Sequence, residues 1–214
     1  VSNTPDAPTL PVAELTLAHM LNLLRAVSTT DDNIRKGNWK PLMGSLLAGK
    51  NVGIVGFGRI GRKVAELVSA FGANVLVHDV APIPPDKKVR QMELSDLLTE
   101  SDIVTLHTPY GPDTHHMIGD QQIRRMKPGA YLLNISRGGL VDESALYNAL
   151  AEKRLAGAGL DAFEREPYSG SLCTLENVVL TAHMGSYAQE ARTKQEQEAA
   201  DNLVAALKEI KLFR

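Results

Sequence analysis

The sequence has few of the features that mark secreted, membrane-spanning or nucleic-acid-binding proteins. Only one of its 214 residues is a cysteine, Cys173, so an internal disulfide framework is excluded and a reducing compartment suits the chain. No apolar run approaches the length of a membrane span. The net charge of -2 offers no attraction to nucleic acid or to an anionic membrane. The first residues lack a basic segment followed by an apolar one, so we expect no signal peptide and a cytoplasmic location.

The sequence does have an ordinary globular composition and a regular alternation of strand and helix patterns. Hydrophobic residues make up 43% of the chain and charged residues 22%, and 214 residues suffice for one good core. Short apolar runs predict strands at 52–55, 75–79, 102–107, 130–135, 156–163 and 178–181. Helical patterns separate most of them, near 94–99, 121–126 and 142–153. Because such alternation requires right-handed crossovers between parallel strands, we predict an α/β fold with a doubly wound parallel sheet.

Both ends of the chain differ from this alternation. Residues 1–11 hold three prolines and are expected to form an extended lead-in, and the last residues, 187–214, are expected to form one long helix. A further helix is predicted from Val12 towards Ile34, ending at Gly37. Its apolar side chains exceed what a half-buried helix needs, so it is either sandwiched in the fold or covered by a second subunit. We expect a homodimer with helix 12–27 as a main contact.

A glycine motif follows the first predicted strand and begins the next helix. Gly56, Gly58 and Gly61 have the spacing G-x-G-x-x-G. Gly56 permits a tight turn, Gly58 lets the backbone approach a pyrophosphate, and Gly61 lets the helix pack close to the strand. The free N–H groups at the helix start form an anion site. Arg59 supports this interpretation, because a cation in the first turn opposes the helix dipole unless an anion lies there.

An acidic residue ends the next predicted strand. Asp79 lies 18 residues after Gly61, where a carboxylate can accept both ribose hydroxyls of an adenosine. The alternative is a glycine-rich turn that binds nothing, but strand, helix and acid agree on a Rossmann-type dinucleotide site. NAD is expected over NADP, because a 2′-phosphate would place about two negative charges beside Asp79. No arginine follows Asp79 within the next several residues to compensate.

The residues after the other strands complete the candidate site, because ligands of open parallel sheets bind outside the carboxyl ends of the strands. Three of those strand ends supply Arg137, Glu166 and His183. An arginine can hold a carboxylate with two parallel hydrogen bonds, and a histidine can donate a proton to a carbonyl oxygen. A carboxylate beside the histidine orients it and favours its charged form. This set suits hydride transfer to a 2-oxo acid.

Three further motifs, at 134–143, 159–167 and 183–186, resemble the D-isomer-specific 2-hydroxyacid dehydrogenases, and among them the phosphoglycerate dehydrogenases. The resemblance implies NAD as cofactor, a 2-hydroxy or 2-oxo acid such as 3-phosphoglycerate as substrate, and Arg137, Glu166 and His183 as catalytic residues. It also implies that Asp161 meets the nicotinamide carboxamide. With the strand ends, the assigned cofactor contacts are Gly56, Gly58, Arg59, Ile60, Gly61, Asp79, His107, Thr108, Pro109, Ile135, Ser136, Arg137, Asp161, His183 and Gly185.

The chain departs from the family pattern in two ways. Ala182 stands where the family usually has proline, which loosens the loop without changing the chemistry. The family's substrate domain comes from sequence before Val1 and after the terminal helix, so residues 1–214 are expected to be the NAD-binding domain alone. Such a chain should bind NAD but turn over 2-hydroxy acids orders of magnitude more slowly than a full-length relative.

Other functions compete with that of a dehydrogenase domain. Corepressors that resemble this family bind the dinucleotide as a signal; retention of the three catalytic residues favours the enzyme, although such regulators can keep them too. A dimerisation scaffold is a second alternative, suggested by helix 12–27. We expect no bound metal, because His78, His115 and His116 have no carboxylate or cysteine at ligand spacing.

Overall fold

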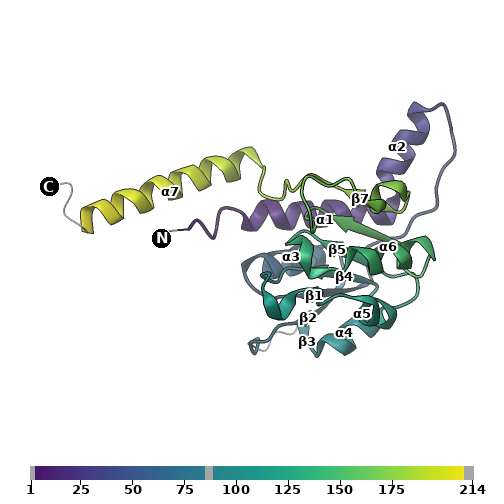
Figure 1. The fold of residues 1–214 in the computed structure, drawn as a ribbon, viewed down its shortest axis with the longest axis horizontal. Helices are drawn as coiled ribbons and strands as arrows, with labels where there is room; N and C mark the ends of the chain where they lie inside the picture. The colour runs from purple at the N-terminus through teal and green to yellow at the C-terminus, as the bar shows by residue number, and fades with distance from the viewer. Residues whose placement is uncertain (1–2, 85–88, 210–214) are drawn as a thin grey trace.

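The computed structural model describes residues 3–84 and 89–209 (Figure 1). Its helices are α1 (Thr9–Arg25), α2 (Val27–Arg35), α3 (Arg59–Ala70), α4 (Leu94–Glu100), α5 (Asp120–Arg125), α6 (Glu143–Ala151) and α7 (Gln189–Glu209). Its strands are β1 (Asn51–Val55), β2 (Asn74–His78), β3 (Val89–Gln91), β4 (Ile103–Leu106), β5 (Tyr131–Asn134), β6 (Gly157–Leu160) and β7 (Val178–Leu180). Residues 1–2 of the predicted lead-in and 210–214 of the predicted last helix lie outside the described residues.

The strands form one parallel sheet in the order β3-β2-β1-β4-β5-β6-β7. Val52 on β1 pairs with Val75 on β2 and with Ile103 on β4, so the chain leaves the centre of the sheet in both directions. The predicted doubly wound parallel sheet is therefore confirmed. Strands β4 and β6 are buried along their whole length, as expected of parallel strands whose two faces are both covered by helices.

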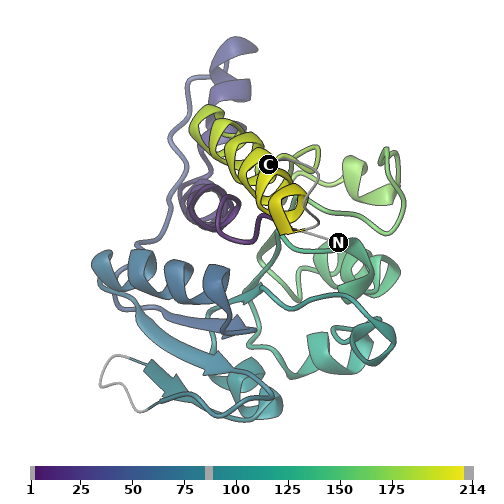
Figure 2. The same ribbon diagram turned by 90° about the vertical axis from the view of Figure 1, so that its left-hand side faces the viewer.

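Helices cover the two faces of the sheet in two groups (Figure 2). On one face α1 and α3 enclose a core that includes Met20, Val64 and Ile54. On the other face α4, α5 and α6 enclose a second core around Leu132. All four of these side chains are almost fully buried, so each face has its own hydrophobic core. The sheet is thus held rigidly enough to fix the positions of the loops at its carboxyl edge.

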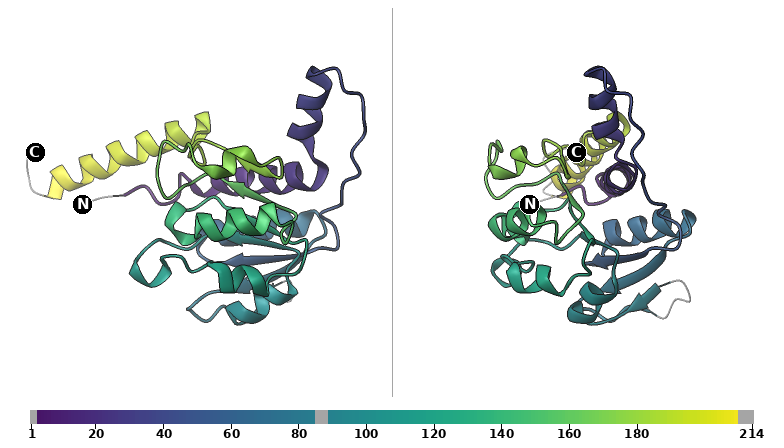
Figure 3. Two further views of the ribbon diagram at one scale, coloured as in Figure 1. Left: turned by 45° about the vertical axis from the view of Figure 1, so that its right-hand side comes forward. Right: turned by 90° about the vertical axis from the view of Figure 1, so that its right-hand side faces the viewer.

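The N-terminal helix is not continuous, contrary to the prediction. It begins at Thr9, inside the expected lead-in, and breaks at Ala26, where φ is +50°. At the break, the Leu24 carbonyl accepts a hydrogen bond from the Ser45 N–H at 2.8 Å, and the Asn22 side chain accepts one from the Ser28 N–H at 2.9 Å. Helix α2 then continues in another direction and extends away from the sheet (Figure 3). The apolar side of α1 is sandwiched, at least in part, against α3 and the sheet.

Two further elements lie at the margins of the fold. Strand β3 was not predicted; it pairs with β2 at the edge of the sheet through Val89, Arg90 and Gln91. The predicted final helix is present as α7, which extends beside the N-terminal segment (Figure 1). Its Asn202 side chain donates a hydrogen bond to the Asn3 carbonyl at 3.1 Å, and its apolar residue Leu203 is exposed. Within the described residues, no helix has the length and apolar character needed to cross a membrane.

Candidate active site

The glycine loop connects β1 to α3, and its glycines meet different demands. Gly56 has φ +93°, and a Cβ there would lie 2.6 Å from the His107 carbonyl oxygen. A Cβ on Gly61 would lie 2.1 Å from the Gly56 carbonyl oxygen, so α3 packs directly on the loop. A Cβ on Gly58 would meet nothing within 4 Å among the described residues. Two glycines are therefore required by the fold itself, whereas Gly58 faces open space at the start of α3.

Asp79 lies beside this loop at the end of β2. Its Oδ2 accepts a hydrogen bond from the Phe57 N–H at 2.6 Å, and its Oδ1 accepts one from the Ala81 N–H at 2.9 Å. Burial alone would raise the pKa of Asp79, but these two hydrogen bonds and the nearby charges of His78 and Arg62 hold it below its usual value. Asp79 is therefore ionised at neutral pH. Arg62, on α3, is a cation near Asp79 that the sequence argument did not foresee.

Arg59, in the first turn of α3, already has an anionic neighbour. Its Nε lies 2.8 Å from Oδ1 of Asp6, and both side chains are largely exposed. Such an exposed ion pair contributes about 0–1 kcal/mol, so it leaves the guanidinium available to another anion. The adjacent Ile60 is half-buried, and Ile135, at the end of β5, is buried; both are apolar and can contribute only packing and backbone groups.

The loop after β4 passes next to the glycine loop. Nε2 of His107 lies 3.0 Å from the Thr105 hydroxyl, and its covered Nδ1 has no partner among the described residues. Burial lowers the pKa of His107 to about 3, so the ring is neutral at physiological pH. The Thr108 hydroxyl lies 3.7 Å from the Met117 sulfur, and the Pro109 carbonyl accepts a hydrogen bond from Thr114. This loop therefore offers an uncharged wall.

The turn after β5 carries Arg137. Asn134, buried at the strand end, accepts a hydrogen bond from the Ser136 N–H and donates one to the Arg137 carbonyl at 2.8 Å. The next residue, Gly138, packs so closely on the following loop that a Cβ would lie 1.8 Å from the Phe163 carbonyl carbon. The Arg137 guanidinium is exposed and donates to the Ser136 carbonyl. The turn is thus fixed while its charged end faces solvent.

The loops after β6 and β7 bring Glu166 and His183 together, as predicted. Nδ1 of His183 lies 2.9 Å from Oε2 and 3.0 Å from Oε1 of Glu166, and the Phe163 N–H donates to Oε1 at 3.1 Å. Burial alone would raise the pKa of Glu166, but hydrogen bonds from His183 and Phe163 and the charges of His183 and Arg137 hold it below its usual value. The turn of Arg137 packs on the loop of Glu166, because Gly138 lies directly against Phe163, and the charge of Arg137 acts on Glu166.

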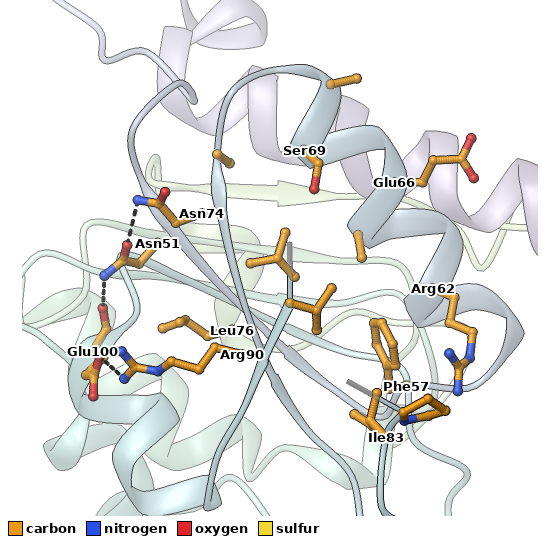
Figure 4. A pocket seen from close by; sticks show the side chains of 16 residues that line it. Asn51, Phe57, Arg62, Glu66, Ser69, Asn74, Leu76, Ile83, Arg90 and Glu100 are labelled. Atoms are coloured by element: carbon orange, nitrogen blue, oxygen red, sulfur yellow. Dashed lines mark hydrogen bonds and ion pairs between the residues drawn. The ribbon is translucent and has the colours of Figure 1, made fainter. Parts of the chain in front are cut away.

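A pocket of about 630 Å³ opens beside this pair and includes Tyr168, Cys173 and Ala182 in its wall. A larger groove of about 1190 Å³ lies elsewhere, between α3 and the β2–β3 edge (Figure 4). Asn74 lies at one end of the groove and Phe57 at the other, and only the end at Phe57 meets the glycine loop. The larger groove is therefore not the candidate catalytic site; the charged residues Glu166 and His183 mark that site beside the smaller pocket.

Asp161, assigned by resemblance to the nicotinamide, is 1% exposed and is engaged by protein groups. Its Oδ1 accepts hydrogen bonds from the Thr181 hydroxyl at 2.6 Å and from the Met184 N–H at 2.8 Å. Its Oδ2 accepts one from the Gly185 N–H at 2.8 Å. Asp161 therefore anchors the turn that carries His183. The sequence argument did not identify Thr181, and only its place at the end of a strand could have suggested it.

The histidines that suggested a metal have other neighbours. Nε2 of His116 lies 2.8 Å from Oε1 of Glu164, and Nδ1 of His115 lies 3.2 Å from the Tyr110 hydroxyl. Nδ1 of His78 lies 3.1 Å from the Met92 carbonyl oxygen. Within residues 3–84 and 89–209, no group of three or more histidine, cysteine, aspartate or glutamate side chains could hold a metal ion.

Comparison with known proteins agrees with this geometry. The family description "D-isomer specific 2-hydroxyacid dehydrogenase, NAD binding domain" matches residues 17–185. A glyoxylate reductase from Thermococcus litoralis is 42% identical, over 97% of this chain and 67% of its own length. A D-3-phosphoglycerate dehydrogenase from Escherichia coli is 41% identical, over 95% of this chain and 52% of its own length. A crystal structure of D-lactate dehydrogenase from Aquifex aeolicus, complexed with NAD and lactic acid, superposes with a TM-score of 0.89 at 32% identity, over 96% of this chain and 68% of that one.

Proposed function

This chain belongs to the D-isomer specific 2-hydroxyacid dehydrogenases, and on that premise we propose that it forms the NAD-binding domain of an enzyme that transfers hydride between NAD and a 2-hydroxy or 2-oxo acid. The observation that carries the proposal is the contact of 2.9 Å between His183 and Glu166, beside Arg137 on the rim that also holds the glycine loop. The chain spans between about half and two thirds of the relatives named above, so the activity of a whole protein is part of the proposal.

The glycine loop fits a dinucleotide. In the described part of the chain, no atom lies within 4 Å of a Cβ built on Gly58, and the first N–H groups of α3 have no intrahelical partner. Ionised Asp79 lies beside the loop and can accept further hydrogen bonds. Arg59 supplies a cation at the same helix start. When bound, NAD supplies or accepts the hydride; the side chains around it bind the substrate and handle the proton.

His183 and Glu166 are suited to proton transfer. Because the pKa of Glu166 is held below its usual value, its carboxylate is ionised and can only accept, so Nδ1 of His183 carries the hydrogen in their contact. The carboxylate thereby fixes the orientation of the ring. Nε2 then holds the proton that passes to the carbonyl oxygen during reduction and returns to His183 during oxidation.

Arg137 is suited to bind the substrate carboxylate. Its guanidinium is exposed on the rim and has N–H groups beyond the one donated to Ser136, so two of them can meet a carboxylate in parallel. Arg137 lies on a turn held by Asn134 and Gly138, and this turn fixes the position of the Arg137 backbone relative to the loop of Glu166. A carboxylate held there places the neighbouring carbonyl group towards His183.

The substrate we propose is a small 2-oxo acid or the matching D-2-hydroxy acid. The names of the relatives, glyoxylate reductase, D-3-phosphoglycerate dehydrogenase and D-lactate dehydrogenase, share this chemistry. The test is absorbance at 340 nm in the complete protein with NAD and a panel of 3-phosphoglycerate, D-lactate, D-glycerate and L-lactate, and with NADH and glyoxylate. Turnover with at least one of the 2-oxo or D-2-hydroxy acids and none with L-lactate supports the proposal; turnover with none of them contradicts it. None of these relatives is a corepressor, so the alternative of a sensing module has no support.

We also propose a cytoplasmic homodimer. The exposed thiol of Cys173 suits a reducing compartment. The loop after α2 presents Trp39 and Met43 with 87% and 100% of their surface exposed, and Leu46 lies near them in sequence. Because large apolar side chains grouped in this way favour burial against a partner, the dimer contact would include this loop together with the accessible side of α1. Light scattering should give a mass near twice 23.2 kDa; a monomer at micromolar concentration counts against the dimer.

A further inference from the structure

A histidine on α1 is buried against the end of the sheet, and the site described above does not use it. His19 is 2% exposed, although it lies in the middle of a helix whose other buried residues are mostly apolar. Its ring lies on Gly159 of β6, where a Cβ would come within 2.8 Å of Nδ1. The absence of a side chain at position 159 therefore makes room for the imidazole. Nε2 of His19 lies 3.1 Å from the Thr181 hydroxyl, just beyond β7.

The direction of the hydrogen bonds follows from the chemistry of the groups. Carboxylate Oδ1 of Asp161 can only accept, so the single hydrogen of the Thr181 hydroxyl points to it, across 2.6 Å. The hydroxyl oxygen is then left as an acceptor, and the contact with His19 requires a hydrogen on Nε2. Burial lowers the pKa of His19, against the opposing charge of Asp161, so the ring is neutral with the hydrogen on Nε2. Nδ1, which has no partner among residues 3–84 and 89–209, is thereby an acceptor and not a buried donor.

This chain of bonds ends on the turn that carries His183. Asp161 receives the Thr181 hydroxyl and the N–H groups of Met184 and Gly185, which places anchors on both sides of His183. His183 itself has φ +50°, a left-handed conformation that a non-glycine residue keeps only when its surroundings impose it. Cooperative strengthening along a buried hydrogen-bond chain makes each link depend on the others.

We propose that His19 is a positioning residue for the active site: it orients the Thr181 hydroxyl toward Asp161 and thereby holds the strained turn of His183 against Glu166. The expected effect on kcat rests on the proposed dehydrogenase function, whereas the expected effect on the conformation of the His183 turn does not. It also gives the buried face of α1 a second role besides packing, because a helix that lies outside the catalytic rim fixes the geometry of the proton donor.

The test compares His19→Gln with His19→Leu in the complete protein. The glutamine amide can donate from nearly the position of Nε2, whereas leucine fills a similar volume without a donor. His19→Leu should lower kcat on the order of tenfold or more, as small displacements of catalytic groups do, with KM for NAD changed less than about threefold. Hydrogen exchange at the amides of Met184 and Gly185 should become faster in the same variant. His19→Gln should restore both readouts to near the wild-type values.

Met20→Ala provides the control, because Met20 is the next residue on the same helix and is 1% exposed, but its thioether has no hydrogen to donate to the Thr181 hydroxyl. Met20→Ala should reduce thermal stability. At temperatures well below unfolding it should leave kcat and the hydrogen-exchange rates of the Met184 and Gly185 amides unchanged. The proposal would be overturned in favour of simple packing if His19→Gln and His19→Leu lost equal amounts of kcat and amide protection, or if Met20→Ala lost as much as His19→Leu. Amide exchange needs no substrate, so if the protein reduces no 2-oxo acid, exchange alone still decides about His19.

Discussion

Gly138→Ala is predicted to separate the turn of Arg137 from the loop of Glu166. The added Cβ would lie 1.8 Å from the Phe163 carbonyl carbon and 2.1 Å from its oxygen. Ordinary carbon contacts are about 3.5–4.0 Å, so the two segments must move apart by about 1.5 Å or more. Both neighbours are backbone atoms, and no side-chain rotation relieves the contact. Overpacking costs typically about 1–3 kcal/mol, and we expect the upper end of that range.

Two measurements follow the effect of Gly138→Ala. For a chain of this length, about 3 kcal/mol corresponds to a fall in Tm of roughly 6–12 °C, measurable by circular dichroism. Because Glu166 would move with the Phe163 segment, kcat should also fall, on the order of a hundredfold for a displacement near 1 Å. An alanine at position 138 with unchanged Tm and unchanged kcat would refute the reasoning that this contact joins the two halves of the site.

Gly58→Ala is the matched control. It makes the same chemical change, but its Cβ meets nothing within 4 Å and its φ of -72° suits alanine. Its stability should be unchanged or higher by about 0.4–1 kcal/mol. The new methyl group occupies the open space where the cofactor is proposed to lie, so the Kd for NAD should rise at least about tenfold. Lost stability without lost NAD affinity would contradict this assignment.

Three other predictions concern charge and assembly. Calorimetric titration should show tighter binding of NAD than of NADP, because the 2′-phosphate meets ionised Asp79; equal affinities would remove this role, and Arg62 would then be the compensating cation. An NMR titration should place the pKa of Glu166 below the ordinary value of about 4.3, and the contact with His183 should be lost as the pH falls through that lowered pKa. His183→Gln should raise the pKa of Glu166, because it removes a hydrogen bond and a charge that favour the ionised carboxylate. Trp39→Ser should shift the mass from light scattering towards 23.2 kDa; an unchanged dimer would exclude this loop as the contact.

The parts of the fold that follow from local patterns could be predicted from the sequence. Apolar runs and the helices between them predicted six of the strands and their parallel pairing, because both faces of such strands are buried and leave a continuous signal. The proximity of Glu166 to His183 also followed, since the carboxyl ends of parallel strands meet at one edge. The family and its cofactor were identified correctly from motifs at those edges.

The remaining features depend on contacts between distant residues. Alanine is the best helix former, so the residue type at position 26 does not indicate a break; there, the Asn22 side chain and the Leu24 carbonyl accept hydrogen bonds from the N–H groups of Ser28 and Ser45. Strand β3 is short and partly polar, and pairing with β2 determines its conformation. The nearness of Arg62 to Asp79, and the bond between His19 and Thr181, join elements far apart in sequence. No periodicity or spacing records such contacts.

The most direct test of the account compares the complete wild-type protein with His183→Gln at saturating NAD and the best substrate of the panel. Absorbance at 340 nm reports turnover, and calorimetry reports NAD affinity. If His183 holds the proton that passes to and from the substrate oxygen, kcat should fall by about 10²–10⁴-fold while the Kd for NAD stays near that of the wild type. Near-normal turnover in His183→Gln would contradict the account, because a glutamine side chain cannot take up and release a proton as imidazole does.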